Sequence, residues 1–142
     1  MSQFHETTHD VYFDDLDAYR ILHNARYILL FERTIGSFWR KLGMNEALDL
    51  ESHPDQSHLV RQNHIDYLKP VIGTGRVRVR IWIEKLGRTS LIFGFTMMPV
   101  DSDDVYATGT RVLVRIDPVT KQPVSWTDKL RDMVSPFIQP RT

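Results

Sequence analysis

Three carboxylates, Asp14, Asp15 and Asp17, fall within four positions of one another near the start of the sequence. A few residues later, Asn24 stands at the beginning of a long apolar-periodic segment, where asparagine is a favourable N-cap for a helix. The first amides of a helix are free and carry partial positive charge. A carboxylate held near them could act as a base or a nucleophile, while the free amides stabilise the negative charge that develops on a substrate oxygen. The alternative is an acidic cluster that only complements the helix dipole.

The helix that would position these groups is predicted from Asn24 to about Gly43. Lys41 in the last turn and Gly43 as the stop are typical of a helix C-terminus. Tyr27, Leu29 and Leu30 widen the apolar face almost to a full cylinder, which predicts a buried helix. The apolar residues that recur at steps of three or four are Ala25, Ile28, Phe31, Ile35, Phe38, Trp39 and Leu42.

The rest of the sequence predicts mainly strands. A nearly continuous apolar segment at 90–98 predicts a central strand covered on both faces. Residues before His9 are expected to be a loose lead-in, and residues 44–57 a long connection with a helical turn at 46–48. One strand, one helix and then four strands predict an α+β fold with a helix on an antiparallel sheet. The predicted strands are 11–13, 58–68, 76–83, 90–98 and 105–116, followed by a short helix at 128–134.

The composition excludes several classes of function. The 142 residues suit one domain, 1–142, and the 18 basic and 18 acidic side chains cancel. A balanced charge argues against a nucleic-acid or anionic-membrane surface. Without cysteine there are no disulfides and no thiolate chemistry. No apolar segment approaches the roughly 20 residues that cross a bilayer. The first residues lack the features of a signal peptide, so a cytoplasmic protein is expected.

No metal site is expected. His5 and His9 are four positions apart, a spacing that suits a metal only on a helix, and this segment has no helical pattern.

The acidic segment resembles the signature of hotdog-fold acyl-CoA thioesterases of the 4-hydroxybenzoyl-CoA thioesterase type. The departure is Arg20-Ile21, where many members carry Gly-His. The resemblance implies a hotdog fold, in which a five-stranded antiparallel sheet wraps around a long central helix. It also implies hydrolysis of an acyl- or aryl-CoA thioester. The matching residues are Phe13-Asp14-Asp15-Leu16-Asp17, Arg20-Ile21-Leu22-His23-Asn24 and Tyr27, with further matches at 67–70, 87–90 and 107–109.

By this resemblance, Asp17 corresponds to the catalytic carboxylate of the family, acting as general base or as nucleophile. The backbone N–H of Asn24 corresponds to the amide that polarises the thioester carbonyl. His23 and Tyr19 are candidates for contact with the substrate. His64 lies on a strand that lines the family's pocket, and which residue of 62–64 points inward depends on a strand register that stays open.

Coenzyme A brings phosphates, and Arg88, Thr89 and Ser90 stand at a turn where the family places phosphate-binding residues. No separate cofactor is expected, because coenzyme A is part of the substrate. Family sites lie between protomers, so a homodimer or homotetramer is expected, and the carboxylate and the phosphate contacts can come from different chains.

Two other functions stay open. A hotdog hydratase or dehydratase needs a histidine paired with an acid across the pocket, and no motif places one opposite Asp17. A non-catalytic module that binds acyl-CoA or an acyl carrier would show tight binding without thioester turnover.

Overall fold

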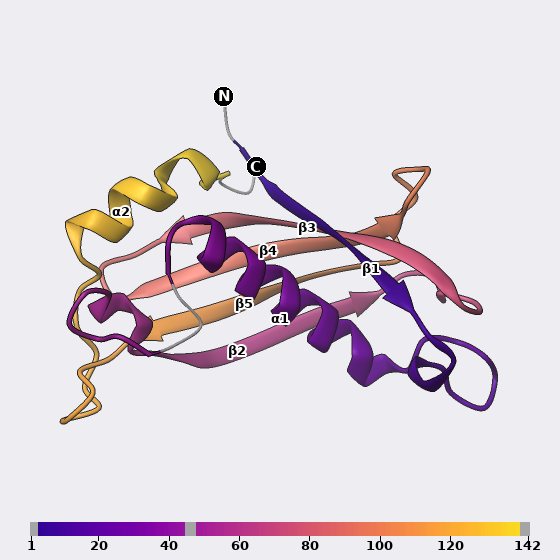
Figure 1. Cartoon of the computed structure of the whole chain (residues 1–142), viewed down its shortest axis with the longest axis horizontal. Coiled ribbons are helices and arrows are strands. Elements are labelled where there is room, and N and C mark those ends of the chain that lie inside the picture. Colours follow the sequence, from indigo (N-terminus) through magenta and orange to yellow (C-terminus); the bar gives the residue numbers. More distant parts are fainter. Residues whose placement is uncertain (1–2, 45–47, 140–142) are drawn as a thin grey trace.

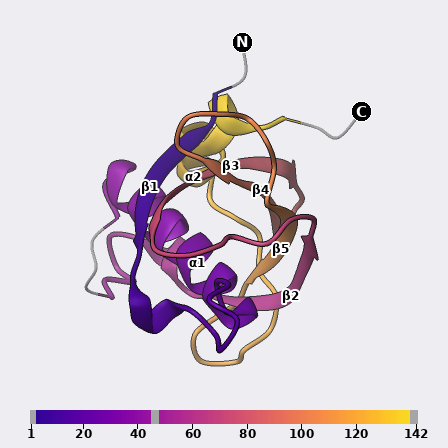
Figure 2. The same ribbon diagram turned by 90° about the vertical axis from the view of Figure 1, so that its right-hand side faces the viewer.

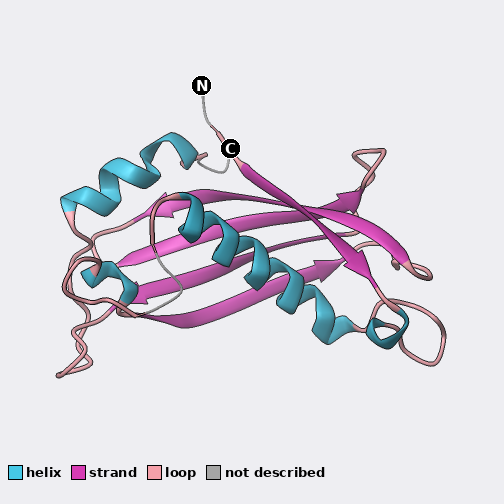
Figure 3. Cartoon of the chain, in the orientation of Figure 1, coloured by secondary structure: helices cyan, strands magenta, loops and turns pink. Residues whose placement is uncertain are grey.

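The computed structural model of the chain describes residues 3–44 and 48–139. Figure 3 shows how these residues divide into helices and strands. The predicted helical turn at 46–48 falls mainly on residues outside the described ranges. The strands are β1 (His5–Val11), β2 (His58–Tyr67), β3 (Gly75–Leu86), β4 (Ser90–Pro99) and β5 (Ala107–Arg115); the helices are α1 (Asn24–Lys41) and α2 (Asp128–Val134). Short 3-10 helices lie at Phe13–Asp15, Pro54–Gln56 and Ser135–Phe137.

The five strands form one sheet in the order β1-β3-β4-β5-β2, and every neighbouring pair is antiparallel. Helix α1 lies along one face of this sheet (Figure 1), and the end-on view shows the sheet curling around it (Figure 2). The predicted α+β class and the hotdog arrangement are confirmed. We call the face toward α1 the inner face and the opposite one the outer face.

The core forms between α1 and the inner face. Alternate residues of β3 and β4 are buried there, as strand geometry requires. Phe31 of α1 stacks on Phe95 of β4 with ring centroids 4.1 Å apart, and Phe38 meets Phe93 edge-on at 5.7 Å. The largest fully buried side chains include Phe31, Phe38, Phe93, Phe95, Ile81, Ile83, Leu91 and Met97.

Two expectations about burial are wrong for the isolated chain. Helix α1 is buried on one side only, and its opposite side exposes Arg33, Gly36 and Arg40. Within residues 3–44 and 48–139, no helix or second sheet covers the outer face of β4, and Thr96 there is half-buried. Gly94 is buried because the Trp82 indole lies over it: a Cβ at Gly94 would come within 2.6 Å of that ring.

The expectation of a loose N-terminal lead-in is also wrong, because His5–Val11 forms the edge strand β1. Its sequence is polar and lacks an apolar alternation, but side-chain hydrogen bonds attach it to α1. The Thr34 hydroxyl lies 2.7 Å from the Thr7 hydroxyl and 2.9 Å from His9 Nε2, and His5 Nε2 lies 3.0 Å from the Ser37 hydroxyl. Hydrogen bonds between polar side chains of β1 and α1 therefore hold this strand in place, in the absence of an apolar face on β1.

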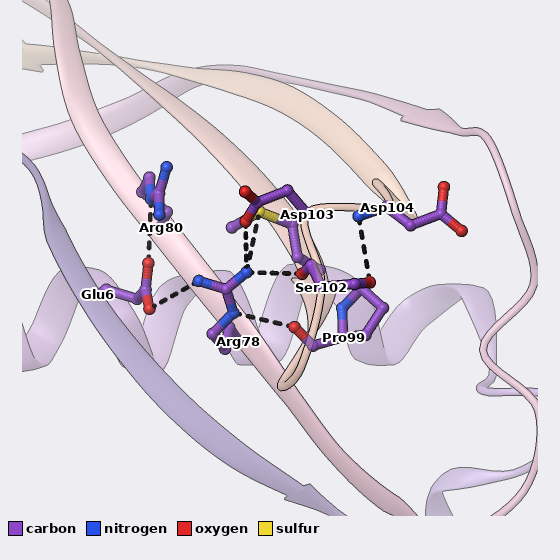
Figure 4. Close-up of polar contacts among 8 residues, drawn as sticks. Glu6, Arg78, Arg80, Pro99, Ser102, Asp103 and Asp104 are labelled. Atoms are coloured by element: carbon purple, nitrogen blue, oxygen red, sulfur yellow. Dashed lines mark hydrogen bonds and ion pairs between the residues drawn. The ribbon is translucent and has the colours of Figure 1, made fainter.

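Arginines on the outer face of β3 join β1 to the loop at 101–104 (Figure 4). Arg78 contacts Glu6 at 3.2 Å and Asp103 at 2.8 Å, and Arg80 contacts the other oxygen of Glu6 at 2.9 Å. The hydrogen bond from Arg78 lowers the pKa of the Asp103 carboxyl below its usual value. These arginines therefore have a structural role, since they connect β3 to β1 and to the loop at 101–104.

The segment after α2 returns to β1. The Gln3 N–H donates to the Pro136 carbonyl at 2.7 Å, and the Gln139 side-chain amide donates to the Gln3 carbonyl at 2.8 Å. The Gln139 N–H donates to Ile83 of β3 at 2.7 Å. The first and last described segments of the chain are thus hydrogen-bonded to each other. None of the described helices is long and apolar enough to span a membrane.

Acidification should destabilise this fold at mildly acidic pH. Burial lowers the pKa of His5, His9 and His58 below the usual value for histidine, about 6.5. For His5 and His9 the nearby cations Lys41 and Arg33 add to this effect, while Asp10 opposes it at His9. Below about pH 6.5 the unfolded chain therefore binds protons that the folded chain does not, so the free energy of unfolding falls as pH falls.

We expect the Tm at pH 5.5 to lie several degrees below that at pH 7.5. A variant carrying His9→Gln and His58→Gln should show a smaller difference. An unchanged or higher Tm at pH 5.5 in the wild-type protein would contradict this assignment.

Candidate active site

A tight turn fixes the orientation of Asp17. Its Oδ1 accepts the backbone N–H of Tyr19 at 2.8 Å and of Ile21 at 3.2 Å, and its own N–H donates to the Ile21 carbonyl at 2.8 Å. Arg20 completes the turn with a φ of 62°, in the left-handed region. Among the described residues, none hydrogen-bonds to Asp17 Oδ2. One carboxylate oxygen is therefore held by the backbone and the other is available to a ligand.

Helix α1 begins one residue earlier than predicted, because His23 and not Asn24 is its N-cap. His23 Nδ1 accepts the Ala25 N–H at 3.1 Å, as an Asn or Ser oxygen would do. Since Nδ1 accepts, the proton of the neutral ring lies on Nε2. Asn24 is the first helical residue, and its N–H has no acceptor in the described part of the chain.

Asp17, His23 and Asn24 line one pocket of about 460 Å³. The pocket lies between the start of α1, the Asp17 turn and the end of β2. The Tyr67 hydroxyl donates to the Asn24 carbonyl at 3.1 Å, and its ring meets Tyr27 edge-on at 4.9 Å. The remaining lining residues are Ile21, Leu22, Leu68, Lys69 and Pro70.

Residues 67–70 were recognised in the sequence as part of the family pattern, but no role was assigned to them. The structure places them on the wall of the pocket. Lys69 Nζ lies 2.7 Å from Asp104, so its charge is paired at the rim. Burial raises the pKa of Tyr27, which keeps this phenol neutral.

The other two acids of the cluster have structural contacts. Asp15 accepts the Tyr12 N–H at 2.8 Å, lies 3.6 Å from Arg26 Nε and accepts the His23 N–H through its carbonyl at 2.9 Å. Asp14 is exposed, and its carbonyl lies 3.4 Å from the Arg26 guanidinium. Of the three carboxylates, Asp17 is the one that lines the pocket.

Two predicted contact residues lie outside this pocket. Tyr19 is 84% exposed at the tip of the turn and contributes its backbone N–H to Asp17. His64 pairs with Thr110 on the outer face and contacts Asp66 at 3.1 Å. Asn63 takes the inward position, where it accepts Arg111 Nε at 2.8 Å, and this settles the register that the sequence left open.

The turn that carries Arg88, Thr89 and Ser90 joins β3 to β4 at the opposite end of the sheet from the Asp17 turn (Figure 1). Arg88 Nη1 donates to the Ser125 hydroxyl at 3.0 Å, and its carbonyl accepts the Trp126 N–H at 3.0 Å. Within one chain these residues do not reach the pocket. Over the described ranges, no three His, Asp or Glu side chains form a group that could hold a metal ion.

Comparisons with known proteins agree with this architecture. A predicted thioesterase from Bacillus stearothermophilus superimposes with a TM-score of 0.81 at 20% identity, over 99% of this chain and 100% of that one. A hypothetical protein from Staphylococcus aureus, solved in complex with CoA, superimposes with a TM-score of 0.84 at 16% identity, over 100% of this chain and 89% of that one. A 1,4-dihydroxy-2-naphthoyl-CoA thioesterase from Synechocystis superimposes with a TM-score of 0.80 at 12% identity, over 94% of this chain and 96% of that one.

At these identities the solved structures show a shared fold. No curated protein matches the chain. The model of the thioesterase-like superfamily matches residues 11–134, which is most of the sequence. The chain therefore belongs to the thioesterase-like superfamily.

Proposed function

We propose that this protein hydrolyses thioesters of coenzyme A with an acyl or aryl acid, as thioesterases of the 4-hydroxybenzoyl-CoA type do. One observation carries the proposal: the free Asp17 oxygen and the unpaired Asn24 amide line the same pocket at the start of a helix. The CoA complex of the Staphylococcus aureus protein and the naphthoyl-CoA thioesterase activity named for the Synechocystis protein support the choice of substrate class.

The proposed chemistry divides between the two groups. The thioester carbonyl oxygen accepts the Asn24 N–H, which stabilises the negative charge that develops on it. Asp17 either takes a proton from the attacking water or attacks the carbonyl carbon itself to form an anhydride that water then cleaves. Both routes release the CoA thiolate and a carboxylic acid. His23 presents an Nε2–H donor beside the same pocket, where it assists in orienting the carbonyl.

A hydrolysis screen over acyl- and aryl-CoA thioesters of different lengths tests this function, with release of the free thiol as the readout. We expect turnover of at least one class. Tight binding of acyl-CoA without thiol release would favour the non-catalytic module instead. Addition of water to an enoyl-CoA without thiol release would favour the hydratase.

We also propose that the protein is a homodimer or a dimer of dimers. The strand β2 is an edge of the sheet and exposes the apolar side chains of Leu59 and Val60. Unpaired edges of this kind invite pairing with a second copy. Antiparallel pairing of two β2 strands about a two-fold axis reverses the direction of the second sheet. The partner's Arg88 turn then lies at the same end of the joined sheet as Asp17.

Light scattering at micromolar concentration should therefore give two or four times the chain mass of 16.7 kDa. A measured mass of one chain would contradict both the proposed dimer and the proposed site shared between two chains.

In this arrangement Arg88 contributes to coenzyme A binding and not to the chemistry, because a guanidinium forms charge-assisted hydrogen bonds with phosphate. Arg88→Ala should raise KM about five- to tenfold with little change in kcat, since the lost contact is exposed. Lys129→Ala removes an exposed cation from the neighbouring helix α2 and is the matched control. A large fall in kcat at unchanged KM would contradict the assignment.

A further inference from the structure

The backbone amides at the start of α1 are held by one residue, His23. The first four N–H groups of a helix have no acceptor within the helix itself. Here the His23 N–H donates to the Asp15 carbonyl at 2.9 Å, the Arg26 N–H donates to the His23 carbonyl at 2.8 Å, and the Ala25 N–H donates to His23 Nδ1 at 3.1 Å. Within the described ranges, the N–H of Asn24 is the one left free. His23 therefore determines which amide of the helix start is available to a ligand.

The bond from Ala25 to His23 requires a neutral ring. An uncharged imidazole accepts through one nitrogen and donates through the other, whereas a protonated imidazole donates through both. Protonation therefore removes the acceptor of the Ala25 N–H and adds a positive charge at the positive end of the helix dipole. Helix α2 differs, because the Thr127 hydroxyl accepts the Leu130 N–H there at 3.2 Å, and a hydroxyl does not titrate near neutral pH. The cap of α1 thus depends on the charge of its residue.

The surroundings of His23 do not replace this cap. His23 is exposed, so a proton reaches its ring from solvent. The first turn of α1 contains no acidic residue that would offset the added charge. Over the part of the chain that the structure describes, the Ala25 N–H is the only hydrogen-bond partner of the ring.

The charged and titratable side chains around His23 come from three sides. Those of the pocket are Asp17, Tyr27, Tyr67 and Lys69. The acidic segment adds Asp14 and Asp15, and α1 adds Arg26. Lys69 is paired with Asp104 at 2.7 Å, and Arg26 lies 3.6 Å from Asp15. These groups influence the charge on the ring without taking over its bond to the Ala25 N–H.

We propose that His23 is a positioning residue whose protonation switches off the active site. The neutral ring holds the first turn of α1 where the Asn24 N–H binds the thioester carbonyl, and the charged ring releases that turn. This inference rests on the proposed hydrolysis, because it gives the Asn24 amide its role. Imidazoles change charge between about pH 5 and 8, and carboxyl groups titrate about two to three pH units lower than imidazoles. Activity therefore falls on acidification well before an aspartate base is neutralised.

This role of His23 is distinct from donation through Nε2. A protonated ring still donates through Nε2, and its charge makes the hydrogen bond stronger. If donation to the carbonyl were the only role of His23, its protonation would not lower the rate. A fall in rate that belongs to His23 therefore reports the loss of the cap.

Two-dimensional ¹H–¹⁵N NMR of the whole chain tests the cap without a substrate. From pH 7.5 to pH 5.5 the Ala25 amide resonance should move with the same midpoint as the His23 ring. In His23→Asn it should stay in place, because an asparagine oxygen caps a helix without titrating. Since no turnover is needed, this measurement separates a failure of the switch from a failure of the proposed hydrolysis.

The pH profile of kcat, measured below the Tm at each pH, tests the link to catalysis. Wild-type kcat should fall about tenfold from pH 7.5 to pH 5.5, as one imidazole ionisation predicts. In His23→Asn, kcat should fall less than about twofold relative to its own value at pH 7.5. His23→Ala should give an equally flat profile with a lower kcat throughout, because it lacks any cap. The variant with His9→Gln and His58→Gln is the matched control and should keep the wild-type profile.

Five results would overturn the proposal. An Ala25 amide that ignores the titration of the His23 ring would show that the cap is kept. A wild-type kcat that is constant down to pH 5.5 would show that the cap does not affect the chemistry. A fall that persists in His23→Asn would belong to another group, and one that disappears in the His9 and His58 control would belong to the stability of the whole fold. A titrating cap in a protein that hydrolyses no thioester would break the link to catalysis.

Discussion

Replacement of Asp17 by asparagine should lower kcat at least about 10²-fold, because general-base assistance alone contributes 10²–10⁴-fold. The side chain keeps its shape, and its amide oxygen can still accept the N–H groups of Tyr19 and Ile21 that hold the turn. Only the negative charge is lost, so Tm and the affinity for acyl-CoA should change little. Steady-state kinetics on the best substrate of the screen, with thermal melts, measure both effects.

Asp14→Asn and Asp15→Asn are the matched controls. Asp15→Asn removes the charge that faces Arg26 and should cost some stability, but neither control should approach the loss in kcat of the Asp17 variant. If Asp15→Asn lost activity while Asp17→Asn kept it, the family pattern would be misaligned by two residues. If all three variants kept their activity, the helix start would be the wrong site.

Asn24→Pro should lower kcat by about 10²–10³-fold, the cost of removing one donor to a developing oxyanion. Proline deletes the backbone N–H at this residue and nothing else that the fold uses. Position 24 is the first residue of α1, where proline is well tolerated. His23 has φ −61° and ψ 135°, the extended conformation that a residue before proline prefers. The carbonyl that accepts the Tyr67 hydroxyl remains in place.

Asn24→Ala separates the backbone from the side chain, since it keeps the N–H and removes the carboxamide. It should retain nearly full turnover. Equal losses in both variants would assign the effect to the side chain, and full activity in Asn24→Pro would exclude the amide from the chemistry.

The sequence predicted α1 well, because its apolar periodicity and its Lys41–Gly43 end are strong local signals. It could not place β1, whose seven residues carry no apolar alternation and are held by hydrogen bonds to Ser37 and Thr34 of α1. The orientation of His64 was equally hidden. A bulge between Val60 and Gln62 inserts a residue into β2, and one extra residue exchanges the two faces of a strand.

The Asp17 turn shows that a departure from the family's sequence pattern does not by itself change the backbone conformation. Glycine is common at position 20 in the resembling family, and the structure explains why: the residue there has a φ of 62°. An arginine takes up this conformation here, with the turn held by four hydrogen bonds of Asp17, one of them from the Arg20 N–H to the Asp17 carbonyl. The departure in sequence therefore leaves the geometry of the turn in place.

The hydrogen bonds from Gln3 to Pro136 and from Gln139 back to Gln3 make the fold suitable for circular permutation. Chains whose first and last segments lie together tolerate a new connection there, provided that the new opening is in an exposed turn. The turn at 117–122 meets this condition, since Val119 is 86% exposed. A chain that starts at residue 120, passes through a short linker and ends at residue 119 would leave the segment from Asp17 to Pro70 uninterrupted. The pocket at the start of α1 would then be built from the same continuous stretch as before.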